Sequence, residues 1–423
     1  MQLSRVPRAL RARSAAVAVG LAALGVGGVA RAEVVSFETA HTVYYESPTR
    51  TNMFVYTPGG ELSAKPTEWL GVRSGYEADI VSGASVSTKA GSAYQANNPA
   101  ADVISTASVK DIRHSGRGGL SLKKGDVTAT GNYAYSTEND YRSHSFNVAI
   151  RTEAYDHNTQ FEISYARNFD RVCDRVQGVN DPPTRWRALE SSDGCFKSDP
   201  LRTQRDLGVD GFQGSWSQAW TPVFVTQLVY TAQVTNGFQS SPYRSIIIGQ
   251  GLRAQEHHPE NRARQALALR MNLYLRPIKA AVRVGVRAYD DTWDIKSGTI
   301  DAELEKYVLE QLRAALRGRL YKQTGALFWS DDYTGGDRPL GPKGQYFTGD
   351  RALSPFWSWS AGARVAWSKH RSSAGRVLGF MESMRAGGSF DVIGFDYAEY
   401  TLGGVPVGSA RAYVGSVDLG LAF

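Results

Sequence analysis

The chain has 423 residues, of which 42% are hydrophobic, 11% aromatic and 21% charged, with 43 glycines and a formal net charge of +7. Aromatic residues are too frequent and charge too moderate for a disordered or collagen-like chain. A mean hydropathy of −0.34 argues against a bundle of transmembrane helices, which would need repeated apolar stretches of about 20 residues.

Residues 1–32 have the three parts of a secretory signal peptide. They contain five arginines and no acidic residue, an apolar stretch over residues 15–29, and the A-x-A cleavage site Ala30-Arg31-Ala32. The alternative is a short N-terminal membrane anchor, but the apolar stretch is short and rich in Ala and Gly, so we expect cleavage. Removing five of the 48 basic residues leaves 43 against 41 acidic ones, and this balance gives no indication of nucleic-acid binding.

The mature chain, residues 33–423, alternates apolar and polar residues with a period of two, which is typical of β-strands. Leu267, Leu269 and Met271, for example, alternate with small or polar residues. Many of these segments exceed the usual soluble strand of about 5–6 residues and reach the roughly 9–11 that a membrane-spanning strand needs. We expect sixteen strands, with fourteen as the alternative, at residues 34–45, 51–57, 69–86, 112–121, 126–138, 141–155, 159–172, 204–220, 223–238, 262–275, 279–290, 297–308, 314–330, 355–369, 376–396 and 410–423.

Short and long connections alternate between these predicted strands. The short turns lie near residues 156–158, 221–222, 276–279, 309–313 and 369–375, and the long polar loops at 89–111, 171–203, 239–261, 331–355 and 397–409. Outer-membrane β-barrels have this plan, with short periplasmic turns and longer extracellular loops. Because every backbone polar group must be paired in lipid, an alternating antiparallel chain can span a membrane only as a closed barrel.

Cys173 and Cys195 lie in the same predicted long loop. An exported chain reaches an oxidising compartment, where we expect the two to form a disulfide. Closing a loop of about 22 residues would stabilise the fold by roughly 3 kcal/mol in the loop-entropy model. Two free thiols are the alternative.

Glu256, His257, His258 and Glu260 suggest a metal site, and a second group, the acidic residues Asp331, Asp332, Asp337 and Asp350 of one long loop, could bind Ca²⁺ but lacks a spaced loop motif. Neighbours on a strand point to opposite faces, and Pro259 favours a loop, so we predict a surface loop with no metal or cofactor. The sequence also contains no G-x-S-x-G, P-loop or C-x-x-C motif, and we therefore expect no enzyme activity.

Charged residues at the start of one predicted strand and at the end of the next would meet at a loop mouth. We predict a rim clamp there, with Trp293 at the lipid interface as part of an aromatic girdle, and a ligand site as the alternative. The clamp consists of Arg262, Arg264, Asp290, Asp291 and Trp293.

Neighbouring strands carry further charges opposite their apolar faces, in the order basic, acidic, basic. These side chains would line the lumen and filter ions or polar solutes. The alternative is a structural ladder in which each pair contributes about 0.2–1 kcal/mol. The predicted pore-lining residues are Arg270, Arg283, Arg287, Asp301, Glu303, Glu305, Arg317 and Arg319.

The C-terminal strand places five apolar residues on one face, opposite Ser416, Asp418 and Gly420. A final alternating strand that ends in Phe resembles the assembly signal of bacterial outer-membrane barrels, which predicts the barrel-assembly machinery as a partner. The alternative is an ordinary hydrophobic strand that ends the chain. The five residues are Tyr413, Val417, Leu419, Leu421 and Phe423.

Several motifs resemble an uncharacterised family of proteobacterial exported proteins, classified as a domain of unknown function. They are found at residues 82–85, 241–244, 260–270, 287–295 and 349–354 and together span most of the mature chain. The sequence departs from the family pattern after Tyr321 and Lys322, where an aromatic-rich continuation is expected. The resemblance implies an outer-membrane barrel and no established catalytic residue.

The sequence therefore predicts an all-β, transmembrane, antiparallel up-and-down barrel that is integral to the bacterial outer membrane and contacts its lipid. A barrel of about sixteen strands leaves an aqueous lumen unless loops plug it. We predict a passive channel or porin-like transporter for small polar or ionic solutes. The alternatives are a structural or interaction barrel that binds a partner through its long loops or lumen, and an outer-membrane enzyme.

Overall fold

The computed structural model describes residues 35–47, 53–82, 104–105, 111–138, 140–175, 202–241, 244–248, 252–331, 346–371, 375–397, 399–402, 405–406 and 408–423. All of them belong to one compact unit. The predicted signal peptide and Cys195 lie outside the described residues. Within these ranges, no helix has both the length and the apolar character required to cross a membrane.

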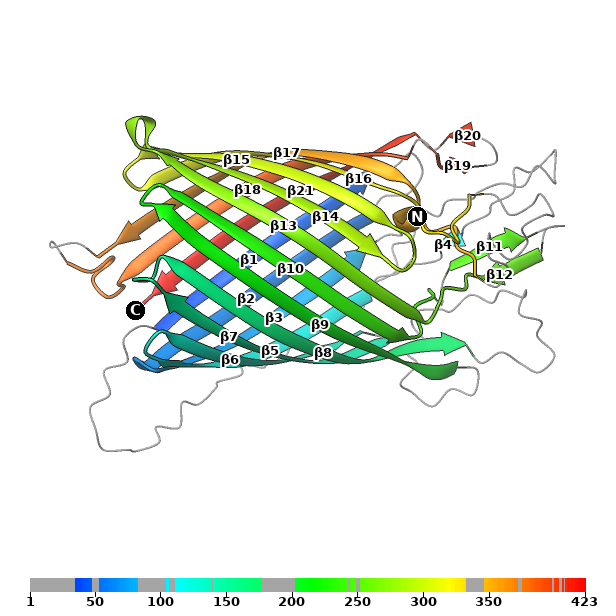
Figure 1. The fold of residues 1–423 in the computed structure, drawn as a ribbon, viewed down its shortest axis with the longest axis horizontal. Helices are drawn as coiled ribbons and strands as arrows, with labels where there is room; N and C mark the ends of the chain where they lie inside the picture. Colours follow the sequence, from blue (N-terminus) through cyan, green and yellow to red (C-terminus); the bar gives the residue numbers. More distant parts are fainter. Residues whose placement is uncertain are drawn as a thin grey trace, which may run out of the picture. The chain divides into compact units, whose positions relative to one another are not determined.

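Sixteen antiparallel strands close into a barrel (Figure 1), which confirms the predicted fold class and strand count. The last strand pairs with the first, so each strand of the barrel has two neighbours. The strands are β1 (Val35–Ser47), β2 (Met53–Thr67), β3 (Leu70–Ser82), β5 (Asp111–Lys124), β6 (Val127–Thr137), β7 (Tyr141–Ala154), β8 (Thr159–Arg175), β9 (Arg202–Thr221), β10 (Phe224–Gly237), β13 (Asn261–Leu275), β14 (Ala280–Asp291), β15 (Lys296–Leu309), β16 (Leu312–Gln323), β17 (Phe356–His370), β18 (Ser383–Asp396) and β21 (Ser409–Ala422).

The two ends of the barrel differ in their connections. At one end, which we call the turn end, short turns join the strands, and Val35 and Phe423 exchange backbone hydrogen bonds there. At the opposite loop end lie the long connections, on the right in Figure 1. They contain the short strands β4 (Ile104–Ser105), β11 (Arg244–Ile248), β12 (Leu252–Gln255), β19 (Thr401–Leu402) and β20 (Val405–Pro406).

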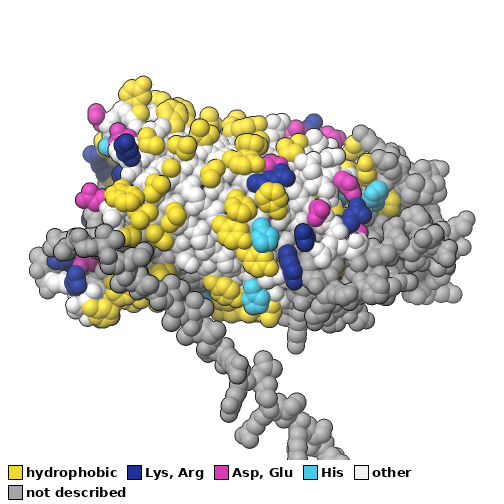
Figure 2. Space-filling model, turned by 90° about the horizontal axis from the view of Figure 1, so that it is seen from below, with side chains coloured by type: hydrophobic (Ala, Val, Ile, Leu, Met, Phe, Trp, Pro, Cys, Tyr) yellow, Lys and Arg dark blue, Asp and Glu magenta, His cyan; other side chains and the backbone are white. Residues whose placement is uncertain are grey.

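The outer wall of the barrel is apolar and exposed (Figure 2). The strand registers place apolar residues of neighbouring strands on this common face, as in the pair Ile150 and Ile163. Ile163 is 68% exposed, Leu316 65% and Val417 63%. So much exposed apolar surface is unfavourable in water, and a membrane-spanning strand presents this face to lipid.

Three strand boundaries differ from the sequence prediction by seven residues or more. β2 ends at Thr67 and not at 57, because it keeps its register with β1 through Pro58-Gly59-Gly60. β16 ends at Gln323 and not at 330, because the following residues pack among the loops. β18 begins at Ser383 and not at 376, because a tight turn with positive φ at Leu378 and Gly379 precedes it.

Polar groups on the outer wall pair with one another. Three Tyr–His hydrogen bonds lie on this face, and β8 and β9 contribute an ion pair between Arg167 and Asp210. Tyr165 donates to the same carboxylate at 2.6 Å, and the Arg167 guanidinium lies 5.1 Å from the centre of the Phe169 ring. Such pairing lowers the cost of polar groups that face lipid.

We predict that Asp210→Ala destabilises the barrel by about 2 kcal/mol, because it leaves the Arg167 charge facing lipid without its carboxylate. The double variant Arg167→Leu/Asp210→Leu removes both charges and should recover most of that loss. Urea-dependent unfolding in phospholipid vesicles measures both effects. Equal stability of the single and double variants would contradict the assignment of this pair to the lipid-facing wall.

Candidate functional site

The inner wall carries a ladder of charged side chains across β14, β15 and β16. Arg283, Glu303 and Arg317 lie directly opposite one another in the strand registers. Arg283 forms an ion pair with Glu303 and contacts Glu305 at 3.4 Å, and Arg313 contacts the other oxygen of Glu305 at 3.4 Å. The central acidic strand therefore neutralises arginines on both of its neighbours.

Arg317 has a different partner from the one its register suggests. Its guanidinium forms an ion pair with Asp391 of β18, and its Nε donates to Asp391 Oδ1 at 2.7 Å. This contact passes over Gly362 of β17, where a Cβ would collide with the Asp391 carboxylate. The glycine thus allows a charged pair to lie flat against the wall.

The strand registers place all eight predicted pore-lining residues on the inner face of the barrel. The side chain of Arg283 is 41% exposed even though it is ion-paired, and that of Arg385, paired with Glu38, is 55% exposed. Arg270, Arg287, Asp301 and Arg319 are also exposed. Side chains that fill a narrow barrel would bury one another.

Three of the five predicted clamp residues meet at the loop end. Arg262 Nε donates to Asp291 Oδ2 at 2.8 Å, and the guanidinium lies 4.0 Å from the centre of the Trp293 ring. Asp291 Oδ1 accepts hydrogen bonds from the backbone N–H groups of Trp293 at 2.9 Å and Ile295 at 3.0 Å. The buried carboxylate thereby fixes both the arginine and the turn after β14.

The two other predicted clamp residues do not join this contact, although Arg264 lies opposite Asp291 in the strand register. Arg264 faces inward but donates to Gln233 at 2.8 Å, and Asp290 lies on the opposite, outer face of β14. The prediction that Trp293 lies at the lipid interface was wrong, because its side chain is only 4% exposed and is covered by loops.

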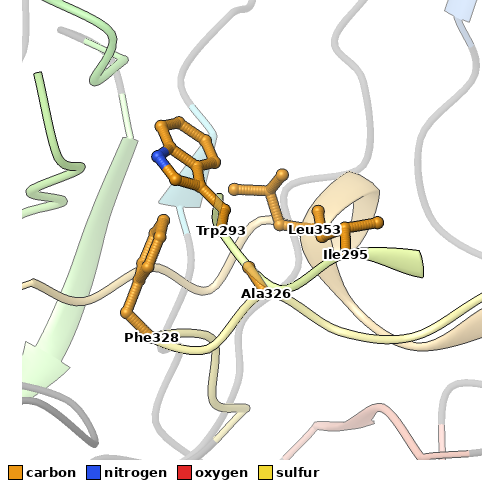
Figure 3. Packing of buried hydrophobic residues seen from close by; sticks show 5 residues of the cluster. All are labelled: Trp293, Ile295, Ala326, Phe328 and Leu353. Carbon is orange, nitrogen blue, oxygen red and sulfur yellow. The ribbon is translucent and has the colours of Figure 1, made fainter. Parts of the chain in front are cut away.

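Trp293 belongs to a buried apolar cluster in which its ring faces Phe328, with Ile295, Ala326 and Leu353 beside them (Figure 3). The ring centres of Trp293 and Phe328 are 5.1 Å apart in an edge-on arrangement. The residues come from the β14–β15 turn and from two parts of the β16–β17 connection. We call the packed segments 255–260, 292–295, 324–331 and 346–355, together with Tyr397, Glu399 and Tyr400, the loop-end cap.

The cap has a polar centre that the sequence did not reveal. The buried Glu256 carboxylate accepts hydrogen bonds from Thr348 Oγ1 and from the backbone N–H of Ser241, both at 2.9 Å. His258 Nε2 lies 3.5 Å from Glu256, and the imidazole packs against Trp293 and Phe328. The prediction of a surface loop was therefore wrong for His258, which is buried.

Backbone pairing joins loops that start far apart on the rim. His257 and Phe347 exchange two backbone hydrogen bonds of 3.0 and 2.9 Å. β4, from the connection between β3 and β5, pairs with β11 from the connection between β10 and β13. The described loops thus support one another at the loop end.

Arg351 anchors the cap to the barrel wall. Its guanidinium lies 2.6 Å from the Glu46 carboxylate of β1, which is almost completely buried and also accepts from Tyr44 at 2.9 Å. The guanidinium also lies 5.8 Å from the centre of the Tyr397 ring. Burial raises the pKa of Tyr397 to about 12, so its phenol is neutral at physiological pH. The alternation along β1 could have identified Glu46 as an inward-facing charge near the end of a strand. Arg351 lies in a loop, where no hydrophobic periodicity predicts the direction of its side chain.

The remaining predicted residues lie on β8 and β21. Cys173 is fully buried near the loop end of β8, while Cys195 lies outside the described residues, so the disulfide stays a prediction. The registers place the five apolar residues of the predicted assembly signal on the outer face, and the Phe423 ring stacks on Phe380 with centres 6.1 Å apart.

We predict that Arg351→Ala loosens the cap, because it leaves the buried Glu46 without its counter-charge at a cost of about 3–5 kcal/mol. Hydrogen exchange should accelerate in residues 346–355 and 397–400 and remain slow in the middle of the barrel. Arg371→Ala is the matched control, since it breaks an exposed 3.2 Å ion pair with Glu382 at the turn end and should cost less than about 1 kcal/mol. The same exchange pattern in both variants would contradict the anchoring role.

Comparisons with solved structures found several similar proteins. One is a bacterial polysaccharide outer membrane secretin, with 8% sequence identity and a TM-score of 0.46, where the match covers 92% of this chain and 98% of the secretin. Another is a BenF-like porin from Pseudomonas fluorescens Pf-5, with 8% identity and a TM-score of 0.43, where the match covers 92% of this chain and 99% of the porin. The siderophore receptor PirA from Pseudomonas aeruginosa is also similar, with 13% sequence identity and a TM-score of 0.38. The match covers 85% of this chain but only 56% of the receptor. At these identities the likeness concerns the fold alone.

No curated protein matches the sequence. A family model described as "Protein of unknown function (DUF3570)" matches residues 16–375. Because this match covers most of the sequence, the chain belongs to the DUF3570 family of proteins of unknown function.

Proposed function

We propose that the protein is a passive, porin-like channel of the bacterial outer membrane for small polar or ionic solutes. The observation that carries the proposal is the exposure of charged side chains on the inner wall. Arg283 and Arg385 keep about half of their side-chain surface accessible even though both are ion-paired. Charged groups that remain exposed inside a closed barrel require water around them.

The size of the barrel supports the same function. Barrels of about eight strands are filled by their own side chains, whereas sixteen strands leave an aqueous channel. Among the described residues, the inward pair Arg317 and Asp391 lies along the wall, over Gly362. The loop-end cap follows the rim and gives the channel a packed mouth on one side.

Outer-membrane targeting is part of the proposal. A cleaved signal peptide over residues 1–32 would export the chain, and the apolar outer face of β21, which ends at Phe423, would be recognised by the barrel-assembly machinery. The disulfide between Cys173 and Cys195 would form after export. We propose no catalytic step, because the charged groups of the ladder mainly neutralise one another.

Single-channel recording of the refolded mature chain in a planar bilayer tests this function. We expect discrete conductance steps, and we expect Arg283→Ala to change the ion selectivity because it exposes the charge of Glu303. Val282→Ala is the matched control, since it alters the neighbouring residue on the lipid-facing side of β14 and should leave selectivity unchanged. A folded, heat-modifiable barrel that inserts without any conductance would contradict the channel function.

A further inference from the structure

Three arginines of the inner wall, among the described residues, have neither an ion pair nor a hydrogen bond. Arg73 and Arg264 also lack a carboxylate partner, but they donate to Asn132 and Gln233. Arg283, Arg317 and Arg385 each form an ion pair with a carboxylate. Among the described residues, no carboxylate oxygen lies within 4.0 Å of Arg270, Arg287 or Arg319. The contact recorded for Arg287 is with the Tyr289 ring, whose centre lies 5.7 Å away.

The three arginines lie on the inner face formed by four consecutive strands. The strand registers place Arg270, Gly285, Asp301 and Arg319 in one row across β13, β14, β15 and β16. Arg287 lies two residues from Gly285 along β14, and therefore on the same face and diagonally next to Arg270. Diagonal neighbours of this kind are separated by about 7–8 Å, a distance that long side chains can span.

Asp301 is the single acid in this row, and it does not neutralise the arginines. Its carboxylate folds over Gly285, with both oxygens 2.7 Å from the point where a Cβ would lie. No arginine nitrogen of the described residues lies within 4.0 Å of it. One carboxylate thus faces three guanidinium groups, and the row carries excess positive charge.

Guanidinium groups suit one class of ligand. They stay protonated at all physiological pH values, and their planar fork forms paired hydrogen bonds with carboxylate and phosphate oxygens. Positive charge in a narrow, low-dielectric passage also raises the local concentration of anions. The exposure of all three side chains leaves these donors accessible to a solute in the lumen.

We propose that Arg270, Arg287 and Arg319 form a binding station for small oxyanionic solutes, carrying carboxylate or phosphate groups, on the inner wall. This inference rests on the channel function proposed above and assigns its substrate class. The neutralised pairs of the ladder stiffen the wall, and the three unpaired arginines select the solute.

The test is the reversal potential in a potassium chloride gradient across a planar bilayer. The native channel should prefer chloride over potassium, and Arg270→Gln/Arg287→Gln/Arg319→Gln should lower that preference by on the order of tenfold. The matched control Arg371→Gln removes an arginine at the turn end, outside the inner wall of the barrel, and should leave the preference unchanged. The triple variant should fold, since it breaks no ion pair, and Arg319→Gln alone should give a smaller shift of the same sign.

Two added solutes identify the ligand chemistry. Succinate or inorganic phosphate should block the native current transiently and have a weaker effect on the triple variant. Block by succinate alone assigns carboxylates, block by phosphate alone assigns phosphates, and block by both assigns oxyanions in general. Conductance without anion preference, or a triple variant and control that behave alike, would overturn the binding station but not the channel. Absence of conductance in a folded barrel would overturn the channel itself.

Discussion

The structure depends on one constraint, which is that backbone N–H and C=O groups inside a membrane must find partners within the protein. Antiparallel strands can meet this requirement only if the sheet has no edge, and here β21 pairs with β1 along almost its whole length. The hydrogen bonds between Val35 and Phe423 complete the closure at the turn end. The even number of strands follows, because both ends of the sheet must meet on the same side.

Closure divides every strand into two faces with different solvents. Apolar side chains such as Leu316 face lipid, and charged ones such as Arg317 on the same strand face the lumen. Charges on the inner wall cannot all remain unpaired at low cost, so most of them form ion pairs along the wall. Glycines such as Gly362 let these pairs lie flat, which keeps the lumen wide. In the proposed channel, the paired charges stabilise the wall and the unpaired arginines bind the solute.

The sequence was sufficient to predict the features that depend on local periodicity. All sixteen strands and the inward direction of Arg283 and Glu303 follow from alternation, which a barrel must obey along each strand. The predictions for the loops failed because burial there depends on contacts between distant segments. Trp293 was predicted to belong to an aromatic girdle, yet it packs against Phe328 and Arg262. No local sequence pattern predicts either contact. The Arg167–Asp210 pair likewise needed two strands in register to be recognised.

Accessibility at two adjacent positions of β15 tests the water-filled lumen most directly. Asp301→Cys places a thiol on the inner face and Ile300→Cys places one on the outer face, and the wild-type chain gives the background. In lipid vesicles, a membrane-impermeant maleimide should label the chain with Asp301→Cys and leave the chain with Ile300→Cys unlabelled. Labelling at position 300, or none at position 301, would contradict the assignment of the charged face to an open lumen.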